Sequence, residues 1–184
     1  MIYPIVLYGS PILRKKSQEI AKGYPNLDKF IEDMFETMYV SDGLGLASPQ
    51  VGKSIRLFVI DGAALAKDDP SMLGFKKVFI NPVIVEETGD EWVYAEGCLS
   101  LPHIREEITR HGTVRIQYYD ADFNFFDETY NGVRARVIQH EFDHLEGKLL
   151  IDHLSPLRRK LLRGKLNDIV KGRSKTEYKT RLLK

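Results

Sequence analysis

The sequence predicts an α+β fold in which antiparallel β-sheets pack around a central helix, with a further helix toward each end of the chain. Strand-like runs lie together between residues 55 and 130 and are separated by short turns, whereas parallel sheets alternate strands with helices. Helical periodicity occurs only on either side of that block. The 184 residues suit one domain over 1–184, with a basic C-terminal helix and tail from about residue 155.

The first expected helix spans residues 27–40. Its apolar residues recur at intervals of three and four, which places them on one face. Asn26 or Asp28 is suited to cap its first turn, and Asp42-Gly43 ends it. Residues 43–50 are expected to form a loop.

Five runs that bear strand-like patterning are expected to form the sheet. They are residues 55–61, 78–86, 91–96, 114–119 and 125–130. Turns are expected at Asn81-Pro82, at Thr88-Gly89-Asp90 and at Gly112. The short connections favour antiparallel neighbours.

Two helices are expected after the strands. Residues 133–145 carry two apolar stripes, so this helix should lie inside the domain. The last helix should begin at Pro156, because proline suits the first helical position, and run to about residue 170. Asp152 or Ser155 marks its start.

Cysteine content and hydropathy restrict the class of protein. Cys98 is the only cysteine, so no intramolecular disulfide is possible, which fits a reducing compartment. The first residues do not have the pattern of a secretory signal, and no apolar run approaches the ~18–20 residues that cross a bilayer. We therefore expect a cytoplasmic protein that does not enter a membrane.

The strongest local pattern is His140-Glu141-Phe142-Asp143-His144. Residues four apart on a helix share one face, so His140 and His144 could occupy neighbouring positions around a metal ion. Glu141 would lie beside them, where it could act on a water molecule. Two histidines at this spacing also arise by chance on core helices, so a third ligand has to be found.

Three ways of completing the site are open. A third histidine six residues after His144 would fit one protease class, but Leu150 stands there and His153 comes three residues late. A later carboxylate would fit a second class, but few acids follow the motif. Cys98 is favoured, because it follows Gly97 at the end of an expected strand and its thiolate suits iron(II) or zinc.

Two rival functions remain at this point. A metalloprotease would share both histidines and Glu141, but it lacks the third ligand that its class requires downstream. A non-catalytic protein with a structural metal would need a fourth ligand, and the chain has no second cysteine to supply it. A Cys/His/His set beside a glutamate favours a site that is open to water.

Three motifs in order resemble the peptide deformylase family. They are Gly43-Leu44-Gly45-Leu46-Ala47-Ser48-Pro49-Gln50, then Glu96-Gly97-Cys98-Leu99-Ser100, then Gln139-His140-Glu141-Phe142-Asp143-His144. The joint pattern is far more specific than any one motif and spans nearly the whole chain. Ser48 departs from the family, which usually has alanine there, and we expect this to affect packing rather than chemistry.

The resemblance implies a metal-dependent hydrolase that removes the formyl group from the initiator methionine of new chains. It implies that Cys98, His140 and His144 bind the metal, with iron(II) the usual ion and zinc or nickel able to replace it. Glu141 is then the acid–base residue. The side chain of Gln50 and the backbone N–H of Leu99 are expected to stabilise the oxyanion.

The resemblance also implies a substrate site. The residues expected to bind the formyl-methionyl peptide are Leu44, Gly45, Tyr94, Arg105, Val133 and Val137. The glycines of the first motif would let an extended peptide backbone approach closely. Tyr94 serves equally well as an ordinary core residue.

Several supporting residues are expected around the site. Glu96 should contact a nearby cation, with Arg110 the partner that the family suggests, while Gln139 and Asp143 should orient the helix or the ligands. Three histidines lack any partner pattern and are expected to be structural or exposed: His103, His111 and His153.

Charge is distributed unevenly along the chain. The formal net charge is +1, yet residues 157–184 hold eleven Lys/Arg and two acids. A helix face exposed to solvent would explain the excess of positive charge in this segment. A contact with ribosomal RNA, which the resemblance suggests, would explain it equally well. We expect the protein to be a monomer.

Overall fold

The structure is a computed structural model and describes residues 1–183. Within them, the helices are α1 (Leu27–Val40), α2 (Gly132–Leu145), α3 (Pro156–Leu161) and α4 (Arg163–Val170). The strands are β1 (Ile5–Val6), β2 (Gly45–Ala47), β3 (Leu57–Asp61), β4 (Lys76–Gly97), β5 (Arg105–Tyr119), β6 (Phe125–Asn131) and β7 (Thr180–Arg181). The expected α+β class is confirmed.

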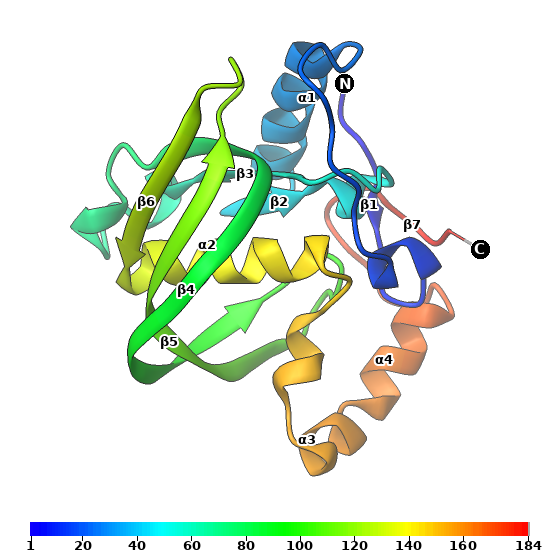
Figure 1. Ribbon diagram of the computed structural model, residues 1–184. Helices are drawn as coiled ribbons and strands as arrows, with labels where there is room; N and C mark the ends of the chain where they lie inside the picture. The colour runs from blue at the N-terminus through cyan, green and yellow to red at the C-terminus, as the bar shows by residue number, and fades with distance from the viewer. Residues whose placement is uncertain (184) are drawn as a thin grey trace.

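The main sheet has five antiparallel strands in the order β2-β3-β4-β5-β6. It curves around α2, which crosses the middle of the molecule (Figure 1). The register between β4 and β5 shifts at three places, and such bulges bend and twist a sheet. The curvature lets one sheet cover more than one side of the central helix.

The division of β4 and β5 differs from the expectation. Strands at 78–86 and 91–96 were expected as separate elements, but both belong to β4, and Gly89, with φ +75°, forms a bulge instead of a turn. Gly112 was likewise expected to be a turn and lies inside β5. Continuous pairing between two long strands keeps the backbone hydrogen-bonded through these glycines, which local sequence cannot reveal.

The helices follow the expected periodicity, with differences at their ends. The limits of α1 are as expected, but Asn26 adopts a left-handed conformation and makes no side-chain cap hydrogen bond. Ser155, rather than Asp152, caps α3 by accepting the Arg158 N–H. One helix was expected over 156–170, and the structure has two, separated at the buried Leu162.

Three clusters of buried apolar residues hold the elements together. One lies between α1 and strands β2 and β3, a second between α2 and the outer strands, and a third joins the N-terminal segment to the end of the chain. The apolar stripe of α2, which includes Ala135, Ile138 and Leu145, is fully buried in the second cluster. Among the described residues, no helix has the length and apolar character needed to cross a membrane.

Candidate metal centre and active site

Helix α2 and the end of β4 bring three potential metal ligands together. His140 and His144 lie one turn apart on α2, with ring centroids separated by 5.1 Å. Cys98 directly follows β4 and places Sγ 3.4 Å from His144 Nε2. One ligand atom from each residue lies within 4.8 Å of the other two. Residues 1–183 contain no other group of three such side chains with this geometry.

The donor set fits a divalent transition metal. Such ions bind thiolate and imidazole, and three protein ligands leave a position open, as catalytic sites require. Burial raises the pKa of the Cys98 thiol, but the charge on His144 and a hydrogen bond with His140 outweigh this effect and lower the pKa to about 5. The thiol is therefore poised to bind as a thiolate.

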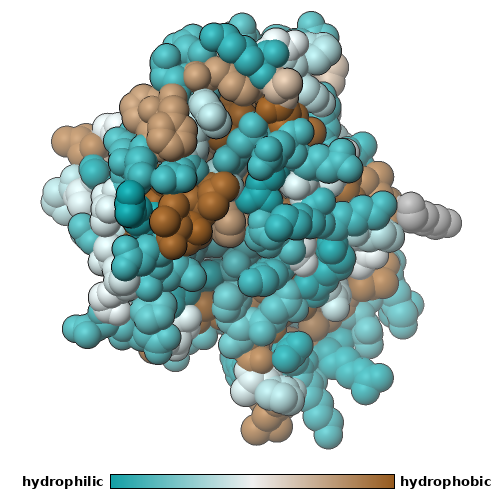
Figure 2. Space-filling model, in the orientation of Figure 1, coloured by the Kyte–Doolittle hydropathy of each residue, from teal (hydrophilic) through white to brown (hydrophobic). Residues whose placement is uncertain are grey.

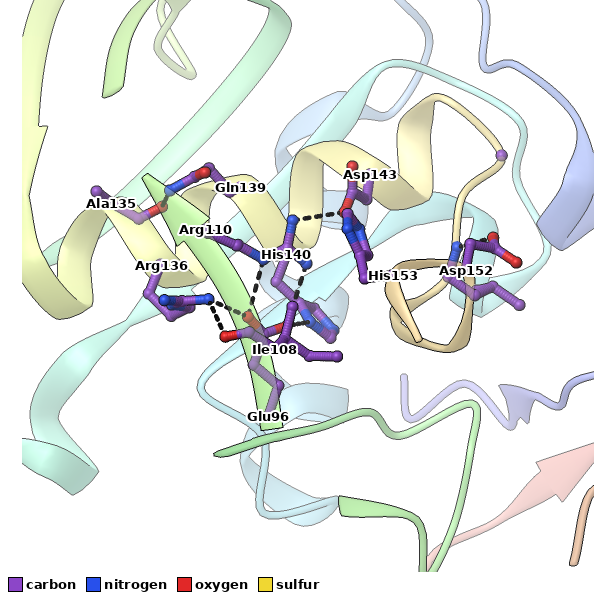
Figure 3. A network of polar contacts seen from close by, with 12 residues as sticks. Glu96, Ile108, Arg110, Ala135, Arg136, Gln139, His140, Asp143, Asp152 and His153 are labelled. Carbon is purple, nitrogen blue, oxygen red and sulfur yellow. Dashed lines mark hydrogen bonds and ion pairs between the residues drawn. The ribbon is translucent and has the colours of Figure 1, made fainter. Parts of the chain in front are cut away.

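A buried carboxylate fixes the orientation of His140 (Figure 3). Glu96 accepts hydrogen bonds from His140 Nδ1 at 2.9 Å, from Arg110 at 2.8 and 3.1 Å, and from Arg136 at 3.0 Å. Burial opposes ionisation of Glu96, but the hydrogen bonds from His140 and Arg110 hold its pKa well below the usual range. The expected contact with Arg110 is confirmed. Because Nδ1 of His140 is occupied, Nε2 is the nitrogen left for a metal.

Asp143 and Gln139 lie beside the ligand group and contact its neighbours. Asp143 accepts from Arg110 Nη1 at 2.7 Å and lies 2.7 Å from His153 Nε2 (Figure 3). Gln139 donates to the His111 carbonyl at 3.1 Å, which ties α2 to β5. His153, for which no partner was expected, thus extends the network around Glu96.

Glu141 is buried next to the ligands and is incompletely hydrogen-bonded. It is 4% exposed, and its Oε2 atom has no hydrogen-bond partner within residues 1–183. Burial raises its pKa to about 7, although His140 and His144 act in the opposite direction. A carboxylate with such a pKa can both accept and donate a proton near neutral pH.

Gly45 on β2 has no side chain, and the Glu141 carboxylate occupies the space that a side chain would fill. A Cβ atom at position 45 would lie 2.5 Å from Glu141 Oε1, closer than unbonded atoms approach. The sequence suggested that this glycine admits a substrate backbone. The structure adds a second reason for a glycine here, which is the close approach of the Glu141 side chain.

A cavity of about 510 Å³ opens onto the ligand group. Five of the six residues expected to bind substrate line it: Leu44, Gly45, Tyr94, Arg105 and Val137. Val133 lies outside the lining and packs, half-buried, against the second core cluster. It stands one turn before Val137 on the same face of α2.

The two expected oxyanion donors also border the cavity. Gln50 accepts the Ala47 N–H through Oε1 at 2.9 Å, so its amide nitrogen lies toward Ser100 Oγ at 3.2 Å and Cys98 Sγ at 3.7 Å. The Leu99 N–H finds no acceptor within the described residues. Both groups are therefore positioned by the fold before any ligand binds.

Ser48 stands outside this arrangement. It is fully buried, and its hydroxyl donates to the carbonyl of Ile55. The hydroxyl is thus satisfied within the fold, and the residue does not line the cavity.

The lining residues that the sequence did not indicate include Leu65, Arg136 and Tyr178. Arg136 stands one turn before His140 on α2, so its spacing could have indicated a place near the site. Leu65 and Tyr178 lie far from every motif, and only the folded chain brings them to the cavity.

Comparisons with known proteins agree with the geometry. The family model described as Polypeptide deformylase matches residues 2–160. The chain is 48% identical to the peptide deformylase of Christiangramia forsetii over 98% of this chain and 96% of that one. It is 50% identical to the peptide deformylase of Cytophaga hutchinsonii, over 97% and 96% of the two chains.

Solved structures show the same likeness. A peptide deformylase from Plasmodium falciparum superposes with a TM-score of 0.82 at 38% identity, covering 91% of this chain and 95% of that one. The enzyme from Thermotoga maritima gives 0.76 at 43% identity, covering 85% and 99%. These matches decide against the protease and non-catalytic alternatives. The chain belongs to the polypeptide deformylase family, the metal-dependent hydrolases that remove the N-terminal formyl group from nascent polypeptides.

Proposed function

We propose that Cys98, His140 and His144 hold the metal ion of this hydrolase and that Glu141 transfers the protons of the reaction. The observation that supports this most directly is the convergence of three ligand atoms beside a buried glutamate at one cavity. A divalent ion there supplies Lewis acidity, which makes a water molecule easier to deprotonate and a carbonyl easier to attack.

Glu141 acts first as a base and then as an acid. It takes a proton from the attacking water as the water oxygen bonds to the formyl carbon. It then passes the proton to the methionine nitrogen as the carbon–nitrogen bond breaks, which yields formate and a free amino group. A pKa of about 7 suits both steps.

The Leu99 N–H and the Gln50 amide stabilise the negative charge that develops on the formyl oxygen. Both border the cavity, and the Ala47 N–H holds the Gln50 side chain in one orientation. Donors that are already oriented need no rearrangement when the charge forms, and loss of one typically costs about 10²–10³ in rate.

The cavity walls suit a formyl-methionyl peptide. Leu44, Tyr94 and Val137 offer apolar surface to the methionine side chain, and the exposed Arg105 lies where the peptide backbone would pass. Val133, one turn before Val137 on α2 and half-buried against the second core cluster, stays a predicted substrate contact. Gly45 lines the cavity, where the peptide backbone can approach it, and it also makes room for Glu141.

We assign iron(II) as the native ion, with zinc or nickel able to take its place. One thiolate and two imidazoles accept all three ions, and a thiolate beside iron is open to oxidation. The test is to load the metal-free protein anaerobically with each ion and then expose it to air. We expect the iron form to be active and to lose activity in air. A zinc form of equal activity would contradict the assignment.

Formate release from a formyl-methionyl tripeptide tests the residue roles. We expect Glu141→Ala to lower kcat by about 10²–10⁴ with the metal still bound, because only the proton transfer is removed. Cys98→Ser should lose the metal. Glu107→Gln, an exposed change on β5, is the matched control and should leave both properties unchanged. A Cys98→Ser protein with full metal content would refute the ligand assignment.

We further propose that residues 1–184 form one cytoplasmic catalytic domain that acts as a monomer at the ribosome. Hydrophilic side chains cover much of the surface over α3 and α4 (Figure 2). Arg159, Lys160 and Arg163 are exposed there and make no ion pair within residues 1–183, whereas Arg158 pairs with Glu106. These free charges could meet RNA phosphates.

Co-sedimentation with ribosomes at increasing salt tests this contact. We expect binding to weaken with salt, and replacement of Arg159, Lys160 and Arg163 by glutamine to weaken it further and to reduce the salt dependence. The matched control is replacement of three exposed lysines elsewhere, Lys22, Lys67 and Lys148. Equal loss in both triple variants would argue against a specific basic surface.

A further inference from the structure

The C-terminal segment, residues 174–183, returns to the active site after α4. β7 pairs in parallel with β1, and the two lie side by side in Figure 1. The Ile5 N–H donates to the Lys179 carbonyl at 2.8 Å, and the Leu7 N–H donates to the Arg181 carbonyl at 2.9 Å. The family model ends at residue 160, so this segment lies beyond the part of the chain that it describes.

Contacts on both sides of Tyr178 hold the segment in place. Before it, His103 Nε2 lies 2.6 Å from the Lys175 carbonyl, and Thr176 Oγ1 donates to the Tyr178 carbonyl at 2.7 Å. After it, Arg181 Nη2 donates to the Val51 carbonyl at 2.8 Å. Tyr178 is therefore fixed by the fold and does not sit on a free end.

Tyr178 contacts the peptide group between Leu99 and Ser100, which directly follows the peptide group that carries the Leu99 N–H. Its ring lines the cavity, and its hydroxyl donates to the Leu99 carbonyl at 2.8 Å. The Cys98 carbonyl accepts the Leu101 N–H at 2.9 Å. Both carbonyls that flank the Leu99 N–H are thus held, while the N–H has no acceptor within residues 1–183.

We propose that Tyr178 is a positioning residue for deformylation, which keeps the Leu99 N–H directed at the formyl oxygen through its hydrogen bond to the Leu99 carbonyl. This inference rests on the proposed role of Leu99 as an oxyanion donor. A donor that is free to rotate loses part of its effect on the transition state, whereas substrate binding depends little on it. Burial and the nearby Cys98 raise the pKa of Tyr178 to about 12, so its hydroxyl stays protonated in any ordinary assay.

Steady-state kinetics of Tyr178→Phe on a formyl-methionyl tripeptide tests the proposal. The phenylalanine keeps the cavity wall and removes only the hydroxyl. We expect kcat to fall about three- to tenfold, as for loss of one neutral hydrogen bond, with KM and metal content unchanged. The amide resonance of Leu99 in the zinc-loaded protein should shift, which reports the contact without any turnover.

Thr176→Val is a second variant that tests the position of Tyr178. It removes the hydrogen bond that holds the Tyr178 carbonyl, so kcat should fall by less than in Tyr178→Phe. In the Tyr178→Phe background, the same change should have no further effect, because the two act through one contact.

Tyr118→Phe is the matched control. Its hydroxyl is bonded to Glu128 on the main sheet, and it does not line the cavity, so kcat should not change. An unchanged kcat in Tyr178→Phe, a rise in KM alone, or an equal loss in Tyr118→Phe would each overturn the inference. A metal-loaded wild type without activity would instead contradict the proposed function, and the Leu99 resonance would still decide whether Tyr178 orders that residue.

Discussion

The carboxylate of Glu96 meets three cationic or proton-donating groups inside the protein. Arg110 and Arg136 are both less than 10% exposed, and their charges are balanced chiefly by Glu96, with Asp143 sharing Arg110. The same carboxylate orients His140. One residue at the end of β4 therefore serves both stability and the geometry of the ligand group.

Glu96→Gln should weaken both properties at once. The change keeps the size of the side chain but leaves buried arginines without their partner, which typically costs about 3–5 kcal/mol in the free energy of unfolding. Metal affinity should fall by about 10–100-fold, because His140 loses its orienting carboxylate. Denaturant titration and metal titration measure the two effects. Glu91→Gln, exposed on the same strand, is the control, and unchanged metal affinity in Glu96→Gln would disprove the orienting role.

Gly45→Ala should impair catalysis more than folding. The new methyl group would meet Glu141 Oε1 at 2.5 Å, so the carboxylate has to move away from the reaction centre. We expect kcat to fall by at least about tenfold, since small displacements of reacting groups have large effects. Gly43→Ala is a graded control, because the nearest atom to its Cβ would be the end of the Leu99 side chain at 3.0 Å, with the Gly45 carbonyl and Met38 at 3.3 Å, and none of these belongs to Glu141. Equal kcat in wild type and Gly45→Ala would show that Glu141 has room to adjust.

At the scale of elements, local patterns predicted the helices better than the strands. The period of apolar residues gave α1 and α2 nearly to their limits, because each helix closes its own hydrogen bonds. β4 and β5 depend on each other along most of their length, so their continuity through Gly89 and Gly112 is a property of the pair. β1 and β7 have two residues each and pair across almost the whole chain, which no local pattern indicates.

The residues of the candidate site show the same contrast between local motifs and tertiary contacts. Cys98, His140, His144 and Glu141 stand in compact motifs, and their residue types alone suggested a metal centre before the fold was known. Tyr178 reaches the cavity through the return of the C-terminal segment, so its place depends on tertiary structure. The residues that carry the chemistry were predictable because they lie in short motifs, and so was the contact of Glu96 with Arg110, whereas the contact of Tyr178 was not.

Two glycines, Gly164 inside α4 and Gly172 just after it, show how backbone conformation affects stability where packing plays little part. In α4, a Cβ on Gly164 would meet no atom within 4 Å, so Gly164→Ala should raise the free energy of unfolding by about 0.5–1 kcal/mol through helix propensity. Gly172 also has space for a Cβ, but its φ is +67°, a conformation that alanine disfavours. Gly172→Ala should therefore lower the free energy of unfolding by about 1 kcal/mol. Urea denaturation measures both, and effects of the same sign would contradict this explanation.

For the molecule as a whole, the outer edge of the main sheet carries a set of ionised carboxylates that acid will neutralise. On β6, Glu128 accepts hydrogen bonds from the hydroxyls of Tyr118 and Tyr130 and from Lys77. Burial opposes its ionisation, but these hydrogen bonds outweigh burial and lower its pKa below 4.5. This network joins three strands, β4, β5 and β6.

Acid should therefore destabilise the fold through this edge. Hydrogen bonds from Arg115 and Gln117 also lower the pKa of Asp127 from 3.8 to about 2. A carboxylate with a lowered pKa stabilises the folded state fully above its unfolded-state pKa, and this contribution disappears as pH falls through the folded-state value. We expect the free energy of unfolding of the wild type to decrease below pH 4.5. The difference in free energy of unfolding between the wild type and the Asp127→Asn, Glu128→Gln double variant should vanish toward pH 2. Urea titrations across this range measure the difference, and an advantage that stays constant would mean that these two carboxylates do not couple protonation to folding.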